Sequence, residues 1–425
     1  MHICRKWRRI VFASQRALLF THGTPVLTTL DYWPTLPILV RYGGLPALNP
    51  PTPEDEGDII AALRHSDRVT SIRLTVTSSL LEKVSAIERP FSELEDLVLL
   101  SRDSVPLTLP NTFLWGSRLR RLHSTRIAVP ALLKLLYSSR NLVDLHLHEV
   151  LNPWHFSPEV LTNALSGMAQ LRSLSLHFLS TLGYRILPPP PGERVVLPAL
   201  TSFNFRGNTE YLEGLVARID APCLGDIEVA FVNEIISELP ALSVFIDRIE
   251  MHKSYRRADI LSSDHRISII LIQPGAPTCL KFRLLCEELS DQLLSVAQIC
   301  THFSAFLFNV EDLRICATRS SGSWKDILFI ERWLEPISSF TGVKRFHVAG
   351  YLSSDIVRAL QLPDKTVLPA LHILYIPQPE PRHAPLPEDV ASFMTSRRLS
   401  GCPIAVEYEQ LCNISELHRL GAGTA

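Results

Sequence analysis

Leu142-Val-Asp-Leu145-His-Leu147 is the clearest copy of a phrase that recurs along this chain: apolar, two variable residues, apolar, one variable residue, apolar. The best copies begin at Leu94, Leu119, Leu142, Leu171, Leu200 and Leu224. Successive copies start between 23 (119 to 142) and 29 (142 to 171) residues apart. A weaker copy is Ile246-Asp-Arg-Ile249-Glu-Met251. A period of this length is typical of a stack of short units, none of which can bury its apolar face alone.

Each phrase predicts one short strand. Its apolar positions are expected to point inward and its variable positions outward, because successive side chains of a strand alternate between faces. Helical segments lie between the phrases: Pro130 opens one over 131–137, and Ser157-Pro158-Glu159 caps another that ends near Gly167. The sequence therefore predicts an α/β leucine-rich-repeat solenoid with irregular repeats, in which a parallel sheet forms the concave face and helices form the convex face.

The pattern loosens after residue 255 but persists. Strands are predicted over 267–272 and 280–284, and a helix over 287–300. Further phrases begin at Val310, Val343 and Leu371, and a last, capping strand is expected over 404–407. The segment 377–387 is rich in proline and is expected to be an exposed link.

Four segments are expected along the chain. Residues 1–20 read as one amphipathic helix with basic residues between its apolar positions. Residues 21–53 form a Pro-rich connector with one strand at 38–42, and residues 411–425 form a tail. The solenoid occupies 54–410 and begins with a helix, because Thr52 can cap it and Pro53 suits the first turn.

Composition excludes several classes of protein. The chain has 425 residues, 46% of them hydrophobic, and a formal net charge of −1, which disfavours nucleic acid as a partner. No apolar run is long enough to cross a bilayer. Eight dispersed cysteines without a Cys-x-x-Cys pair are typical of a reducing compartment. A cytoplasmic or nuclear protein without membrane contact is therefore expected.

Motifs that carry chemistry are absent from the sequence. It contains no phosphate-binding motif of the form Gly-x-x-x-x-Gly-Lys or Gly-x-Gly-x-x-Gly. It also contains no Gly-x-Ser-x-Gly and no His-Glu-x-x-His. The sequence predicts no catalytic residue, no cofactor and no metal site, and hence a protein that is not an enzyme.

Outward positions of the predicted sheet carry charged and imidazole side chains. Histidines on neighbouring strands can converge and bind zinc, but their spacing matches no recognised zinc pattern. Mixed charge suits a protein partner better than a nucleic acid, although an ordinary solvated face accounts for it equally well. The candidate partner-binding residues are Arg73, Asp96, Arg121, His123, Asp144, His146, His148, His177, Asn204, Glu228, Arg248, Arg314, His347 and Tyr375.

The first residues suggest a family. Ile3-Cys4-Arg5-Lys6-Trp7-Arg8-Arg9-Ile10-Val11 resembles the last helix of an F-box, where a Cys-Arg-x-Trp-Arg core leads into a short apolar stretch. Together with the irregular repeats, the chain resembles a fungal F-box/leucine-rich-repeat protein of the kind abundant in mushroom-forming species. A basic amphipathic helix that caps the first repeat is the alternative.

The resemblance implies that the protein recruits substrates to a ubiquitin ligase. An F-box docks on the Skp-type adaptor of a cullin-RING ligase, and the repeats hold a target protein whose identity the sequence does not give. The adaptor-docking helix would use Ile3, Cys4, Trp7, Arg8, Ile10 and Val11. An F-box normally begins with a Leu-Pro-x-Glu-Ile segment, which does not precede them here. Either the gene is longer than this reading or adaptor docking is lost; a free-standing interaction scaffold, monomeric outside its complex, is the alternative.

Overall fold

A computed structural model describes most of the chain. The described residues are 17–32, 36–43, 51–101, 103, 106–109, 113, 118–150, 156–179, 193–236, 238–263, 265–275, 278–286, 288–317, 327–350, 353–361, 367–377 and 387–409. They form two compact units, one of Met1–Gly207 with Gly214–Cys223 and one of Asn208–Glu213 with Leu224–Ala425. The proposed F-box helix and the predicted tail lie outside the described residues.

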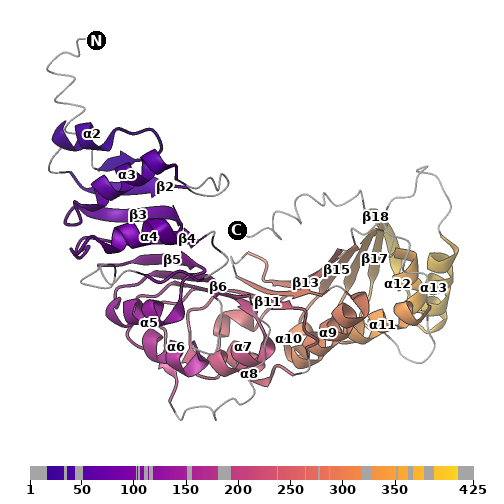
Figure 1. The fold of residues 1–425 in the computed structure, drawn as a ribbon. Coiled ribbons are helices and arrows are strands. Elements are labelled where there is room, and N and C mark those ends of the chain that lie inside the picture. Colours follow the sequence, from indigo (N-terminus) through magenta and orange to yellow (C-terminus); the bar gives the residue numbers. More distant parts are fainter. Residues whose placement is uncertain are drawn as a thin grey trace, which may run out of the picture. The chain divides into compact units, whose positions relative to one another are not determined.

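The first unit alternates strands and helices (Figure 1). Its strands are β1 (Leu18–Phe20), β2 (Ile38–Tyr42), β3 (Val69–Val76), β4 (Asp96–Ser101), β5 (Arg121–Thr125), β6 (Asp144–Val150), β7 (Ser173–Phe178), β8 (Val195–Val196), β9 (Ser202–Gly207) and β10 (Ile219–Asp220). Its helices are α2 (Val26–Tyr32), α3 (Pro53–Leu63), α4 (Ser78–Ser85), α5 (Val129–Ser138) and α6 (Pro158–Leu165), and α7 (Thr209–Val216) spans the division between units.

The sheet of the first unit is parallel, in the order β1-β2-β3-β4-β5-β6-β7-β9, with β8 and β10 pairing apart from it. Each strand is offset by one repeat from its neighbour, so equivalent phrase positions pair. Buried ladders result. One consists of Ile72, Leu97, Leu122, Leu145, Leu174 and Phe203, all at most 1% exposed. The predicted inward orientation of the phrase is confirmed.

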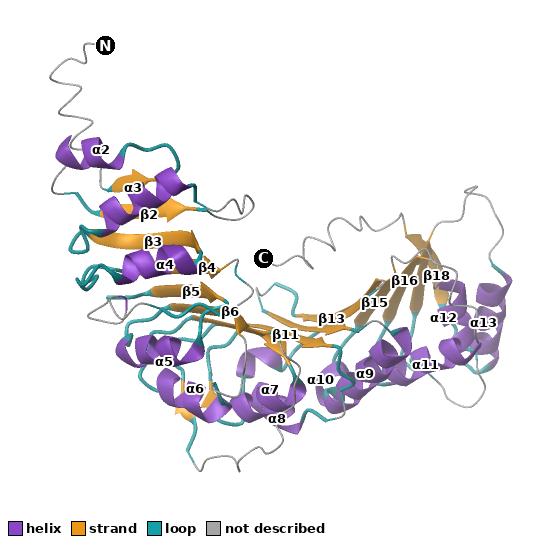
Figure 2. Cartoon of the chain, in the orientation of Figure 1, coloured by secondary structure: helices purple, strands orange, loops and turns teal. Residues whose placement is uncertain are grey.

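Helices cover one face of this sheet and leave the other open (Figure 2). Their starts follow from local chemistry. Thr52 and Asp55 form a reciprocal capping box at the start of α3, and Ser157 accepts a hydrogen bond from the Val160 amide at the start of α6. Pro53 and Pro158 occupy first-turn positions that need no amide donor.

The second unit has the same alternation. Its strands are β11 (Asp226–Val232), β12 (Arg257–Ser263), β13 (Arg266–Ile272), β14 (Cys279–Leu285), β15 (Asp312–Ala317), β16 (Arg345–Gly350), β17 (Ile373–Pro377) and β18 (Ala405–Glu409). Its helices are α8 (Pro240–Asp247), η3 (Glu250–His252), α9 (Leu289–His302), α10 (Ser304–Leu307), α11 (Ile327–Ser338), α12 (Ser353–Ala359) and α13 (Glu388–Leu399).

One part of the second sheet is not parallel. The order is β11-β14-β13-β12-β15-β16-β17-β18, and β13 runs antiparallel to both β12 and β14. The fold is therefore α/β, with a mostly parallel sheet, and the wholly parallel sheet predicted from the phrase is wrong at β13. Short connections at 264–265 and 273–278 explain the reversal, because parallel neighbours need a longer crossover.

Two further predictions differ from the structure. The weak phrase at 246–251 is not a strand: it covers the end of α8, the helix cap Arg248 and η3. Pro240 starts α8, and Leu242, Phe245 and Ile246 are buried at helical spacing. Residues 18–20 form β1, whereas a helix was expected over 1–20, and the predicted connector contains α2 in addition to the expected strand β2. The four segment boundaries stay predictions.

Candidate partner-binding face

The open face of the first sheet presents three parallel rows of side chains. The first row is Ser71, Asp96, Arg121, Asp144, Ser173 and Ser202. The middle row is Arg41, Arg73, Val98, His123, His146, Ser175 and Asn204. The third row comprises Thr75, Leu100, Thr125, His148, His177 and Arg206. In-register pairing places side chains from distant parts of the sequence next to one another.

Asp96 is the centre of an ionic cluster on this face. Its Oδ2 accepts hydrogen bonds from Nε and Nη2 of Arg73 at 3.0 and 2.7 Å and from the Ser71 hydroxyl at 3.1 Å. Nη2 of Arg121 lies 3.8 Å from the same oxygen. The Asp96 side chain is only 6% exposed, so these neighbours, and not water, compensate the charge of its carboxylate.

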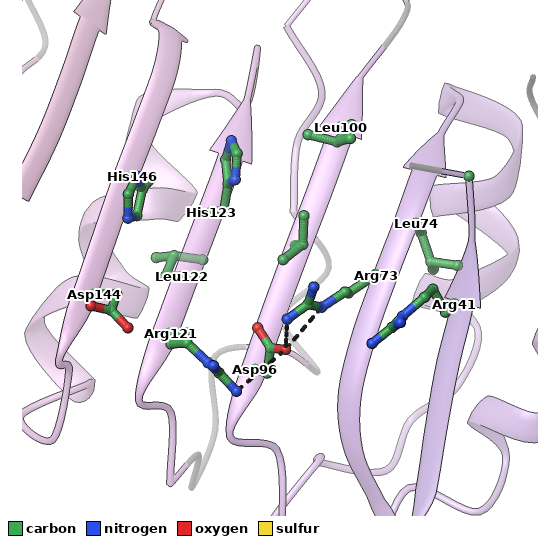
Figure 3. Close-up of a pocket in the computed structure, with 12 residues that line it drawn as sticks. Arg41, Arg73, Leu74, Asp96, Leu100, Arg121, Leu122, His123, Asp144 and His146 are labelled. Carbon is green, nitrogen blue, oxygen red and sulfur yellow. Dashed lines mark hydrogen bonds and ion pairs between the residues drawn. The ribbon is translucent and has the colours of Figure 1, made fainter. Parts of the chain in front are cut away.

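The cluster lines a shallow depression of about 450 Å³ (Figure 3). Arg41, Arg73 and Arg121 reach into it from three strands, and His123 and His146 continue it along the sheet. The Asp96 Oδ1 and the His123 Nε2 are buried and have no hydrogen-bond partner among the described residues. Both atoms lie beneath the surface of the depression, so it is the guanidinium groups that a ligand would meet first.

Four imidazoles from β5, β6 and β7 form a continuous cluster. The rings of His148 and His177 stack with centroids 4.0 Å apart, and His123 lies 4.8 Å from His148 and 5.6 Å from His146. The Ser175 hydroxyl lies 3.1 Å from Nε2 of His148, and Nε2 of His177 lies 3.0 Å from Oδ1 of Asn204. The predicted approach of His146, His148 and His177 is confirmed, and His123 joins them.

Burial holds three of these imidazoles in their neutral form. Burial, and then the adjacent His146, lower the pKa of His123 to about 4. Burial, and then the stacked His177, lower the pKa of His148 to about 3. Burial also lowers the pKa of His146, which Asp144 partly opposes. At neutral pH these three rings offer hydrogen bonds without charge.

The pairing of Ser175 with histidine does not form a catalytic triad. Nε2 of His177 faces both the Ser175 hydroxyl at 3.5 Å and the Asn204 oxygen at 3.0 Å, whereas a triad base uses two different ring nitrogens. Ser175 is also only 4% exposed. A histidine whose pKa is as low as that of His148 is in addition a poor general base at neutral pH.

The second unit presents a row of its own on the corresponding strand positions. It comprises Glu228, Lys281, Ile270, Asp259, Arg314, His347, Tyr375 and Glu407. Glu228 accepts from Arg283 at 2.6 Å, and Arg257 holds both oxygens of Asp259 at 2.8 Å. His347 and Tyr375 stack with centroids 4.1 Å apart. Charges on this unit are thus largely paired within it.

Most residues predicted for the partner-binding face lie on these rows. Arg248 is the exception, because it caps α8 at its carboxyl end and its guanidinium lies 5.7 Å from the Phe245 ring. The predicted strand position of Arg248 is wrong because its phrase is helical, and its role in partner binding stays a prediction. The residues of the adaptor-docking helix lie outside the described part of the chain.

Three basic residues on these rows were not among the residues that the sequence predicted for the partner-binding face. Arg41 lies next to Arg73 on the middle row, Arg206 next to His177 on the third row, and Lys281 next to Glu228 on the second unit. Each occupies a variable position between two buried strand residues, so the alternation of the strand alone would have found them.

No group of three or more histidine, cysteine or acidic side chains among the described residues is arranged to hold a metal ion. In the same residues, no helix is long and apolar enough to cross a membrane.

Comparisons with known proteins find four solved chains that match this one. No family model matches this sequence, and no curated protein matches it. A solved leucine-rich repeat-containing protein, LegL7 from Legionella pneumophila, aligns over 90% of this chain and 98% of its own, with 14% identity and a TM-score of 0.31. The in-register strands and buried ladder of this chain itself define its repeat architecture.

Proposed function

We propose that this protein is a non-catalytic scaffold that binds a protein partner through the open sheet face of its first unit. The three rows of side chains on that face support the proposal. Helices cover the opposite face only, and the open face combines imidazoles, guanidinium groups and the apolar Val98 and Leu100. Such a mixture is typical of protein interfaces, which combine apolar contact with matched polar groups.

A pair of charge-changing variants tests the proposal. His146→Glu alters the middle row, whereas Lys134→Glu alters an exposed position of α5 on the helix-covered face. Proteins captured from the source organism by the wild type should be retained by Lys134→Glu and lost by His146→Glu, and one captured protein, purified, should show the same order of affinity. Equal retention by both folded variants would contradict the proposal.

A finer proposal concerns the purpose of the binding. The resemblance of residues 3–11 to an F-box helix supports recruitment of the bound protein to a ubiquitin ligase through a Skp-type adaptor. The alternative is a free-standing scaffold. Purified chain and purified adaptor decide between them: the ligase proposal requires a complex that Trp7→Ala weakens. If neither the wild type nor Trp7→Ala forms a complex with the adaptor, only the free-standing scaffold proposal remains.

A further inference from the structure

Acidic and basic side chains are segregated on the open face of the first unit. The carboxylates of the three rows, Asp96 and Asp144, both lie in the first row. The middle and third rows carry three guanidinium groups and four imidazoles, and no carboxylate on the described strands β2 to β9. These two adjacent rows therefore contain cationic and imidazole groups but no carboxylate on the described strands.

The ends of these rows carry the available charge. The Arg73 guanidinium already donates two hydrogen bonds to Asp96. Arg41 on β2 and Arg206 on β9 are exposed and form no ion pair with any residue that the structure describes. Between their strands lie His123, His146 and His148, which burial keeps neutral and whose cationic form a nearby anion would favour. An occupant with negative charge along its length would match this distribution.

The dimensions favour an extended chain. The middle row crosses six strand pairings between β2 and β9. At about 4.8 Å each this is about 29 Å, the length of about nine residues of extended peptide. Alternate side chains of such a peptide would face the sheet.

We propose that the middle and third rows of the first unit bind an extended acidic segment of the partner protein, with carboxylates against Arg41, Arg206 and the imidazoles between them. The proposal rests on the proposed function, since it names the chemistry of a partner for the same face. An acidic peptide is the proposed occupant, and a nucleic acid is the alternative that the experiment decides.

Binding is coupled to protons. The charged and titratable groups that face the imidazole cluster are Arg73 on β3, Asp96 on β4, Arg121 on β5, Asp144 and Glu149 on β6, and Arg206 on β9, with Arg126 paired to Glu149. A bound carboxylate raises the pKa of a neighbouring imidazole, so the complex takes up protons. Affinity for an acidic segment should therefore rise as the pH falls from 7.5 to 5.5, where glutamate stays ionised.

The probe is a fluorescein-labelled nine-residue peptide in which glutamate alternates with serine, measured by fluorescence anisotropy against the full chain. A peptide with glutamine in place of glutamate is the control for charge. Arg41→Gln and Arg206→Gln remove the two terminal charges, and Arg64→Gln, an exposed position at the end of α3, makes the same change on the helix-covered face. An oligothymidylate of equal charge tests the nucleic-acid alternative.

The acidic peptide should bind more tightly than its glutamine counterpart and than the oligothymidylate. Arg41→Gln and Arg206→Gln should each weaken binding about two- to fivefold, the scale of an exposed ion pair, and Arg64→Gln should not. His123→Gln should reduce the gain at pH 5.5. Equal weakening by Arg64→Gln, tighter binding of the oligothymidylate, or no preference for glutamate overturns the acidic-segment proposal. Partner capture that still depends on His146 would leave the scaffold proposal intact.

Discussion

His148 on β6 stacks on His177 of β7 with ring centroids 4.0 Å apart and ring planes 8° from parallel. Two stacked imidazoles cannot both be charged at this distance without strong repulsion. The stack therefore disfavours protonation of both rings, and this links the stability of the open face to pH.

Acidification should destabilise the first unit through this cluster. The pKa of His148 is about 3 in the folded chain and near 6.5 in an unfolded one, so the unfolded state binds more protons between these values. The contribution of His148 to the free energy of unfolding is therefore fully present above about pH 6.5 and decreases as the pH falls towards 3. His148 alone should cost about 1.4 kcal/mol between pH 7.5 and 5.5. Urea denaturation at the two pH values measures the loss.

His148→Gln isolates this contribution, because glutamine keeps a hydrogen bond to Ser175 but does not titrate. The variant should lose about 1 kcal/mol less than the wild type on the same acidification. His65→Gln, whose side chain contacts none of the four rings, is the control and should follow the wild type. If His148→Gln loses as much stability as the wild type between pH 7.5 and 5.5, the imidazole cluster is not the cause of the acid destabilisation.

The inward ladder should dominate stability over the outward rows. Leu145 and Leu174 are 0% exposed and pair across β6 and β7, so Leu145→Ala or Leu174→Ala should each cost about 2–5 kcal/mol. His146→Ala, on the open face between Leu145 and Leu147, should cost less than about 1 kcal/mol. Urea denaturation midpoints, compared among variants with the same denaturant dependence, provide the measurement. If His146→Ala were more destabilising than Leu145→Ala or Leu174→Ala, the assigned facing of the strand would be wrong by one residue.

The phrase predicted this ladder because strand alternation and repeat spacing both depend on local sequence. It also predicted which variable positions share the open face, since equivalent positions of parallel repeats pair. The approach of His146, His148 and His177 followed from that rule alone, and the same pairing brings His123 beside His146.

The direction of a strand and the identity of weak repeats did not follow from the phrase. Ile267–Ile272 alternates equally well in a parallel or an antiparallel sheet, and only the connections around β13 decide. At 246–251, apolar residues at positions one, four and six satisfy a strand phrase, but Phe245 and Ile246 continue the periodicity of α8. Helical packing that starts at Pro240 decides that segment.

The backbone at Gly43 limits what can stand at the end of β2. Gly43 has φ of +82°, and a Cβ there would lie 2.2 Å from Oγ1 of Thr75. Gly43→Ala should therefore destabilise the first unit by about 1–3 kcal/mol from the backbone conformation, with the clash in addition. Gly23→Ala is the matched control, because Gly23 has φ of +73° but no atom within 4 Å of a Cβ. Equal losses in the two variants would show that Thr75 moves freely aside.

The ionic cluster should respond unequally to the loss of either partner. The Asp96 side chain is 6% exposed and that of Arg73 is 38% exposed. Arg73→Gln leaves a buried carboxylate whose remaining neighbours are Ser71 and, at 3.8 Å, Arg121. Asp96→Asn leaves a guanidinium that water can still reach. Thermal or urea denaturation should show Arg73→Gln to be the more destabilising change, by about 1–3 kcal/mol, because an unsatisfied buried charge costs more than an exposed one. A greater loss in Asp96→Asn would mean that Arg73, and not Asp96, depends on the pair.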